Sequence, residues 1–179
     1  DVDKFDYIAR DSYMMGMRSV CDYSRLIMNS RVIAGEVCFN SKQAYELYEL
    51  FHQRYSLHKQ VYSHRVGKAI EYMLGDCFTL ADPHIELSER LSSPASFTGL
   101  TDSILKEIEI SKEPVLEDAR KVIHNIRRRK LYKMAIEALL VDSAEPNPTL
   151  NEDIIVSCSN GSLTRNDVIV QHLSLNYCE

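Results

Sequence analysis

The sequence has little of what marks several common protein classes. Its 179 residues carry a formal charge of −5, so no excess of positive charge indicates broad nucleic-acid binding. It contains no apolar run near membrane-spanning length and no signal-peptide pattern, so we expect no membrane contact. Internal repeats and low-complexity tracts are also missing. The 45% of hydrophobic residues suffice for one globular domain or for a large piece of a bigger one.

The cysteines do not indicate a disulfide framework. They are five in number, widely spaced, and never arranged as Cys-x-x-Cys. This favours reduced thiols in an intracellular protein of the nucleus or cytoplasm, and it argues against a structural zinc site. The sequence also begins without Met, inside an apparent helix cap, so we interpret it as a fragment or a processed product.

The pattern along the chain predicts a mostly α-helical body with a short β-hairpin. A helix is expected to end near Gly16, and the hairpin turns at Ala34-Gly35. Asn40 or Ser41 then caps the longest helical pattern, which we expect to be bent or split, with Gly67 as a candidate position. The predicted helices are 2–15, 42–80, 97–110 and 116–140, and the predicted hairpin is 31–39.

A change of character at Pro146-Asn147-Pro148 predicts a second, smaller lobe. Residues 153–158 read as a strand, Asn160-Gly161 as a turn, and 167–177 as a further strand. The expected domains are therefore a helical body over 1–140 and the start of a small β-containing lobe over 141–179.

The first helix carries the first candidate site. Lys4, Tyr7 and Asp11 are spaced i, i+3, i+7 and share one stripe, with Asp3 close by. A cation, a phenol and carboxylates together suit a polyphosphorylated ligand and its metal. The alternative is an ordinary helix start, because acidic residues near a helix N-terminus favour the helix dipole.

The long helix carries the second candidate site. Arg54, His58, Tyr62 and Arg65 are spaced i, i+4, i+8, i+11 and would lie on one stripe. Arginine matches phosphate oxygens, histidine can donate or relay a proton, and tyrosine can stack or hydrogen-bond. The alternative is a solvated helix face with the tyrosine packed beneath it.

Both stretches resemble one known family. Residues 1–11 read Asp-Val-Asp-Lys-Phe-Asp-Tyr-Ile-Ala-Arg-Asp, and residues 51–58 read Phe-His-Gln-Arg-Tyr-Ser-Leu-His, followed by Tyr62-x-His64-Arg65-Val-Gly. These strings are similar to the eukaryotic SAM-and-HD-domain deoxynucleoside triphosphate (dNTP) triphosphohydrolases. The likeness spans most of residues 1–140, and it implies the C-terminal half of an HD-type helical domain.

The resemblance implies a role for each matched residue. Asp3 would be the last ligand of a catalytic divalent metal, which could be Zn, Fe, Mn or Mg, and Lys4 would contact phosphate. Arg54 would hold the terminal phosphate, with His58 close to the phosphates. Three residues would line the sugar and help exclude a 2′-hydroxyl: Tyr7, Asp11 and Tyr62. Ser63 stands where the family has Gln, which leaves base contacts open.

The implied reaction converts dNTP and water to deoxynucleoside and triphosphate. The family's metal site also needs a His, an adjacent His-Asp pair and a distant Asp, and this sequence contains no His-Asp pair. We therefore expect three ligands to lie upstream and this chain alone to be inactive.

The resemblance further implies control by GTP or dNTP, with Mg, in a homo-oligomer that is a dimer or tetramer. The implied nucleotide contacts are Arg25, Lys42, His64, Arg65, Arg129 and Lys133. Two departures suggest that this regulatory site is altered or lost: Asn40 replaces Arg and Glu46 replaces Asn. The basic run at 127–133 reads equally well as a solvated face late in a helix.

Two non-enzymatic hypotheses remain open from the sequence. One is a non-catalytic module that binds nucleotide, single-stranded nucleic acid or a second subunit. The other is a scaffold whose C-terminal lobe only mediates assembly. The combination of Asp3, Lys4, Tyr7, Arg54 and Tyr62 favours the enzyme.

Overall fold

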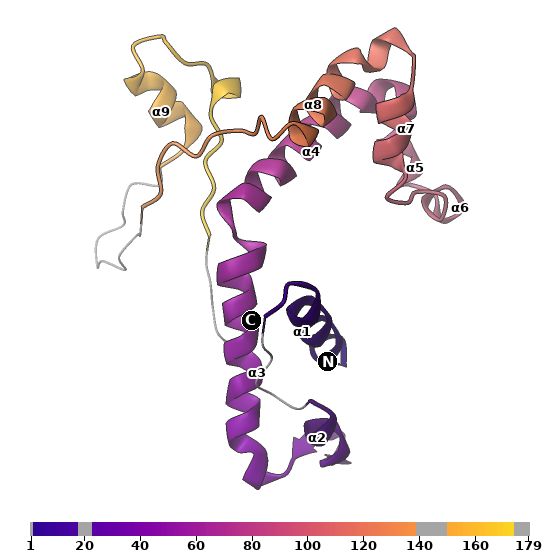
Figure 1. Cartoon of the computed structure of the whole chain (residues 1–179), viewed down its shortest axis with the longest axis vertical. Coiled ribbons are helices and arrows are strands. Elements are labelled where there is room, and N and C mark those ends of the chain that lie inside the picture. Colours follow the sequence, from indigo (N-terminus) through magenta and orange to yellow (C-terminus); the bar gives the residue numbers. More distant parts are fainter. Residues whose placement is uncertain (1, 18–22, 139–149, 174–179) are drawn as a thin grey trace. The chain divides into compact units, whose positions relative to one another are not determined.

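The computed structural model describes residues 2–17, 23–138 and 150–173 (Figure 1). The chain divides into two compact units, Asp1–Ala135 and Ile136–Glu179. The described part of the first unit is helical apart from one antiparallel hairpin, as the sequence predicts.

The N-terminal helix ends where the sequence predicts. Helix α1 (Val2–Met14) is followed by Gly16 at φ +66°, a left-handed conformation that glycine adopts without steric cost. The amide of Met17 donates to the carbonyl of Ser12 at 2.8 Å, which closes the helix C-terminus. Helix α2 (Tyr23–Met28) then leads into the hairpin.

The predicted hairpin is confirmed. Strands β1 (Ser30–Ile33) and β2 (Glu36–Phe39) pair antiparallel with Val32 opposite Val37. Ala34 and Gly35 both have positive φ, which is the two-residue turn that matches strand twist.

The long helical pattern is confirmed in type but divided differently than predicted. It comprises η1 (Ser41–Gln43), α3 (Ala44–Leu57), the π-helical turn η2 (His58–Tyr62) and α4 (Arg65–Ile85). Asn40 caps the start, as expected, by accepting from the Lys42 amide at 3.0 Å. The long pattern is split, as expected, but not at Gly67. The helix breaks at Ser63–His64, because His64 adopts an extended backbone and its Nδ1 accepts from the Val66 amide.

The two later helices are shorter than predicted. The segment predicted as helix 97–110 contains only the end of α6 (Pro94–Phe97) and then α7 (Ile104–Ile110). Helix α8 (Glu117–Arg127) does not continue to residue 140, because Arg129 has φ +59° and the Lys130 amide turns back to the Asn125 carbonyl. Two short elements complete the unit, α5 (Leu87–Arg90) and η3 (Pro114–Leu116).

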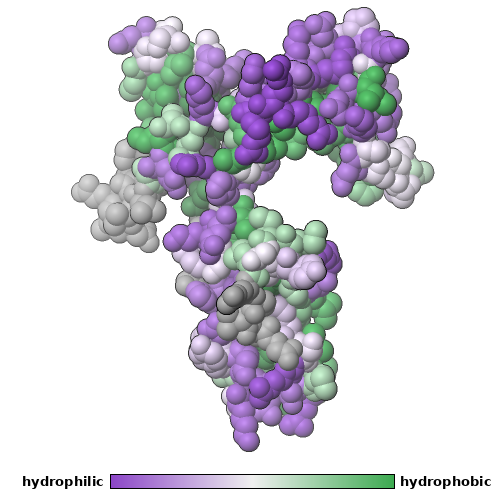
Figure 2. All heavy atoms as spheres, in the orientation of Figure 1, coloured by the Kyte–Doolittle hydropathy of each residue, from purple (hydrophilic) through white to green (hydrophobic). Residues whose placement is uncertain are grey.

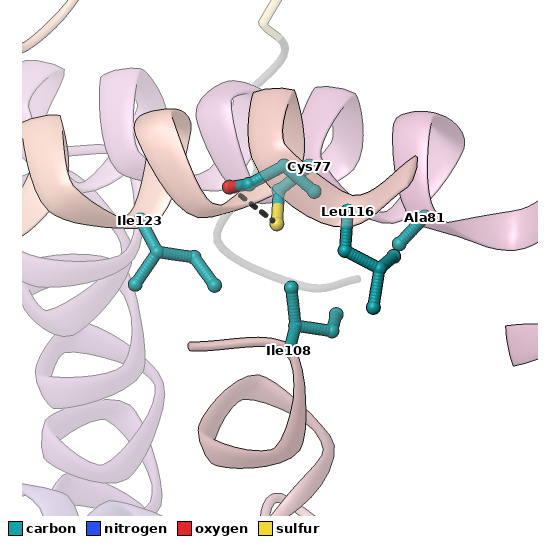
Figure 3. Close-up of a cluster of buried hydrophobic side chains, with 6 residues drawn as sticks. Cys77, Ala81, Ile108, Leu116 and Ile123 are labelled. Carbon is teal, nitrogen blue, oxygen red and sulfur yellow. Dashed lines mark hydrogen bonds between the residues drawn. The ribbon is translucent and has the colours of Figure 1, made fainter. Parts of the chain in front are cut away.

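Two hydrophobic clusters stabilise the first unit. The α1–α3 cluster contains Ile8, Tyr23, Leu26, Leu50 and Leu57, and α1 packs beside α3 (Figure 1). The α4–α8 cluster lies where α4 packs along α8, and α7 packs against α8 at the same place (Figure 3). Its buried members are Cys77, Ala81, Ile108, Leu116, Ala119 and Ile123.

The surface mixes hydrophilic and hydrophobic residues (Figure 2). Exposed apolar side chains occur on α2 and the hairpin, including Met28, Val32 and Val37. Within the described ranges, no helix has both the length and the apolar character that crossing a bilayer requires.

The second unit corrects two sequence predictions. The predicted strand 153–158 is instead helix α9 (Glu152–Cys158), which Asn151 caps by accepting from the Ile154 amide at 3.0 Å. Asn160 and Gly161 have positive φ, as a turn requires. The short helix η4 (Arg165–Asp167) ends at the first residue of the region predicted as strand 167–177. Residues 168–173 form no strand, and residues 174–177 lie outside the described ranges.

Candidate functional site

The predicted stripe of α1 faces the predicted stripe of α3 and the π turn. The Lys4 Nζ lies 5.0 Å from the centre of the Phe51 ring. The rings of Tyr7 and Tyr62 lie 6.4 Å apart, and the Tyr62 hydroxyl donates to the Asp11 carboxylate. Residues 51 positions apart in sequence therefore share one polar and aromatic face.

The π turn positions the two rings at the end of this face. His58 and Tyr62 pack edge to face, with ring centres 4.9 Å apart. A wider π turn brings residues four apart closer to eclipsed than an α-helix does, and such turns are frequent at functional sites. Arg65 does not continue the stripe, because the chain leaves the helix after Tyr62 and re-enters it as α4.

Burial and neighbouring charge set the protonation of this face. Burial, and then the positive charge of Arg54, lowers the pKa of His58, so its imidazole is neutral at pH 7. Burial, followed by the hydrogen bond to Asp11, raises the pKa of Tyr62 well above its ordinary value. Tyr62 is therefore a protonated donor across the physiological range.

Asp3 lies exposed near the start of α1. A catalytic metal needs several converging ligands, and the described residues contain no group of three His, Cys, Asp or Glu side chains that could hold one. The residues of the described chain thus do not by themselves fit a metal centre.

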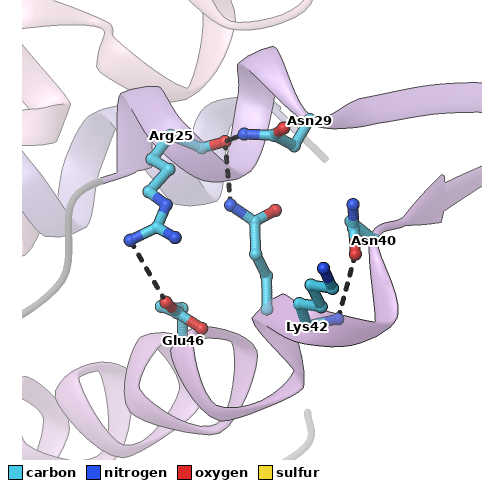
Figure 4. Close-up of polar contacts among 6 residues, drawn as sticks. Arg25, Asn29, Asn40, Lys42 and Glu46 are labelled. Carbon is cyan, nitrogen blue, oxygen red and sulfur yellow. Dashed lines mark hydrogen bonds and ion pairs between the residues drawn. The ribbon is translucent and has the colours of Figure 1, made fainter.

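Arg25 and Lys42, two of the residues that the resemblance assigns to regulation, lie near one another (Figure 4). Arg25 on α2 forms an ion pair with Glu46 on α3 at 3.9 Å, and its carbonyl accepts from the Gln43 side chain at 3.3 Å. Lys42 follows Asn40 at the cap of η1.

The other four residues assigned to regulation lie on other elements. His64 caps α4 and Arg65 begins it, while Arg129 and Lys133 follow α8. A hollow of about 420 Å³ lies on α8, but none of its lining residues belongs to either predicted site.

Sequence reasoning missed a buried polar pair between the two stripes. The Gln53 amide donates to the Ser12 hydroxyl at 3.2 Å, and both side chains lie in the interior. The available signal was spacing, since Ser12 is four residues from Ile8, and Gln53 lies between Leu50 and Leu57 at helical intervals. Both positions belong to the apolar faces of their helices.

Comparison with known proteins defines the family. A family model described as the HD associated region matches residues 21–155, so the chain belongs to this family. The resemblance found in the sequence is thereby confirmed.

Several curated relatives carry the name deoxynucleoside triphosphate triphosphohydrolase SAMHD1. The chain is 51% identical over 178 residues to the homolog from Dictyostelium discoideum, covering 99% of this chain and 34% of that protein. It is 31% identical over 202 residues to the Danio rerio protein, covering 99% and 32%, respectively. It is 38% identical over 147 residues to the Homo sapiens protein, covering 74% and 24%. The chain thus spans about a third or less of these relatives.

Proposed function

We propose that this chain forms one wall of the substrate site of a dNTP triphosphohydrolase, which converts dNTP and water to deoxynucleoside and triphosphate. One observation carries the proposal. Lys4, Tyr7 and Asp11 on α1 contact Phe51 and Tyr62 on the elements that also carry Arg54 and His58. The names of the relatives supply the reaction.

In this proposal the cations bind the triphosphate. The Arg54 guanidinium donates two parallel hydrogen bonds to the terminal phosphate, and the Lys4 ammonium neutralises a second phosphate. Negative charge grows on the triphosphate as it leaves, so both cations bind the transition state more tightly than the substrate. His58 is neutral before binding, because burial and the positive charge of Arg54 lower its pKa, and in this proposal it approaches the same phosphates.

The aromatic side of the face binds the deoxyribose in this proposal. The hydrogen bond to Asp11 fixes the Tyr62 hydroxyl, so the ring presents a rigid surface to the sugar. Tyr7 packs against Tyr62 and narrows the space in which a 2′-hydroxyl would have to fit. The divalent metal would rely on Asp3 together with ligands that the described residues do not supply.

The test uses the intact protein that contains this region. Purified protein is incubated with dGTP and a divalent metal, and deoxyguanosine and triphosphate are separated by ion-exchange chromatography. We expect both products in equal amounts and their loss in Asp3→Ala. Asp6→Ala is the matched control, because Asp6 lies on the same helix but pairs with Arg10 on its exposed face.

Two results would contradict the proposal in different ways. Tight dGTP binding without release of triphosphate would instead support a non-catalytic nucleotide-binding module. Equal activity in the wild type and Asp3→Ala would remove Asp3 from the metal site.

Regulation by nucleotide is the second part of the proposal. Arg25 and Lys42 lie near one another, but Arg25 is paired with Glu46, where the family has Asn. A carboxylate beside Arg25 competes with phosphate, so we propose a weakened assembly-linked nucleotide site. Light scattering of the intact protein with GTP and dNTP tests it. An unchanged mass in both the wild type and Glu46→Asn would eliminate the site.

A further inference from the structure

The interior between α1 and α3 contains a polar pair that hydrophobic packing does not require. Ser12 is fully buried and Gln53 is 9% exposed, and the Gln53 amide donates to the Ser12 hydroxyl at 3.2 Å. Around them the cluster is apolar, with Ile8 on α1 and Leu50 and Leu57 on α3. Apolar residues of similar volume could fill this space without the cost of desolvating an amide and a hydroxyl.

A buried hydrogen bond fixes the register of two helices in a way that apolar contacts do not. Leucine and isoleucine surfaces tolerate a small slide or rotation, whereas a donor and an acceptor must meet within a few tenths of an ångström. The Ser12–Gln53 pair therefore selects one relative placement of α1 and α3.

The position of the pair links this register to the proposed substrate site. Ser12 directly follows Asp11, and Gln53 directly precedes Arg54. Each partner of the bond is thus covalently adjacent to a residue of the polar and aromatic face. A shift of α1 along α3 would move Asp11 away from Tyr62 and change its spacing to Arg54.

We propose that Ser12 and Gln53 are positioning residues, which hold the α1 and α3 halves of the substrate face in the register that hydrolysis needs. This inference rests on the proposed function. It assigns to the pair a role in the reaction beyond its contribution to folding.

The test measures activity and stability together in the intact protein. Gln53→Met keeps the side-chain length and removes the amide, and Ser12→Ala removes only the hydroxyl. We expect kcat/KM for dGTP to fall about tenfold in each, mostly in kcat, because displaced groups lose transition-state contacts. The double variant should fall no further, since both changes break one interaction. Ser12→Thr, which keeps a hydroxyl, should retain most of the activity.

Cys77→Ala is the matched control for stability. Cys77 is fully buried in the α4–α8 cluster, and its thiol contacts the Ala119 carbonyl at 3.5 Å. It should lower Tm by an amount similar to Gln53→Met while leaving kcat/KM of the folded protein unchanged. If Gln53→Met fails to fold, Ser12→Ala provides the same test.

The outcomes separate this inference from the proposed function. If the wild type hydrolyses dGTP and both single variants stay within about twofold of its kcat/KM, the positioning role is overturned and the proposed function survives. If the wild type releases no triphosphate, both fail together.

Discussion

The two hydrophobic clusters of the first unit differ in what their interiors contain. Among the residues that the structure describes, the α4–α8 cluster buries apolar side chains and one thiol, whereas the α1–α3 region also buries Ser12, Gln43 and Gln53. Beside the α1–α3 cluster, Lys4 lies over the Phe51 ring, Tyr7 packs against Tyr62, and Tyr62 donates to Asp11.

This difference suggests a division of labour. Apolar packing alone gives stability, but small shifts between the helices then cost little free energy. Such packing suits a scaffold. Buried polar pairs add little net stability and restrict geometry, which suits a site whose groups must meet one ligand. The comparison predicts that changes in one cluster alter activity and changes in the other alter stability.

The largest expected effect is on activity, from Arg54→Ala in the intact protein. Loss of the proposed paired hydrogen bonds to the terminal phosphate should lower kcat/KM for dGTP by about 100-fold or more. Arg54→Lys keeps the positive charge but cannot donate two parallel hydrogen bonds, so it should recover only part of the lost kcat/KM. Steady-state kinetics with dGTP measures both.

Arg120→Ala, on helix α8 beside the other cluster, is the control. Its guanidinium donates to the Glu113 carbonyl at 2.7 Å and lies outside the proposed site. It should lower Tm slightly and leave kcat/KM unchanged. If Arg120→Ala impaired catalysis as much as Arg54→Ala, the comparison between clusters would collapse.

The second effect is on stability, from Ile108→Ala in the α4–α8 cluster. Ile108 is fully buried, so the cavity and the lost apolar contacts should cost about 3 kcal/mol of unfolding free energy. Urea denaturation measures the cost. Ile110→Ala, on the same helix but 62% exposed, should change it by less than about 0.5 kcal/mol. Activity of the folded fraction should be unchanged in both.

Local signals made part of the fold predictable. Gly16 ends α1, Ala34-Gly35 turns the hairpin and Asn40 caps the long helix, because each acts through its own backbone and nearest neighbours. The end of α8 was not predictable in this way, because Arg129 occupies the left-handed position where glycine is usual. Helix α9 was missed because a run of Ile and Val outweighed the cap at Asn151.

The candidate site was predictable only as two separate stripes. Helical spacing grouped Lys4 with Tyr7 and Asp11, and it grouped Arg54 with His58 and Tyr62. It could not reveal the π turn or the break at His64, because an α-helical period assumes an uninterrupted helix. Neither could it pair Ser12 with Gln53, since that contact depends on how two helices pack. The roles of these residues in binding stay predictions.

A smaller effect is expected from pH, through His58. Its pKa is lowered, so nucleotide-free protein carries a neutral imidazole at pH 7. Because the folded-state pKa lies below that of the unfolded chain, the folded state loses stability as pH falls below about 6.5. A bound triphosphate would favour the charged form, so dGTP affinity should rise as pH falls. If binding raises the pKa by one unit, the total rise in affinity cannot exceed about tenfold.

Titration of dGTP into the intact protein in EDTA, which prevents turnover, measures this slope. His58→Gln should flatten the slope to that of the triphosphate itself. His52→Gln changes a histidine on the preceding helix α3, whose Nδ1 lies 4.0 Å from the Glu49 carboxylate, and it should keep the slope. Identical slopes in all three proteins would place His58 away from the phosphates.

The smallest effect concerns Arg129, which lies just beyond the α4–α8 cluster at the end of α8. A non-glycine residue at φ +59° is strained, so Arg129→Gly should stabilise the protein by about 0.5 kcal/mol after the entropic cost of glycine. Arg128 has φ −88°, so Arg128→Gly removes the same charge without relieving strain and should destabilise. Thermal unfolding of the two variants gives the difference.

If Arg129→Gly also weakens the response of assembly to GTP while Arg128→Gly does not, the strained arginine contributes to nucleotide binding. If assembly responds equally in both, Arg129 is a structural cap at the end of α8 and makes no nucleotide contact.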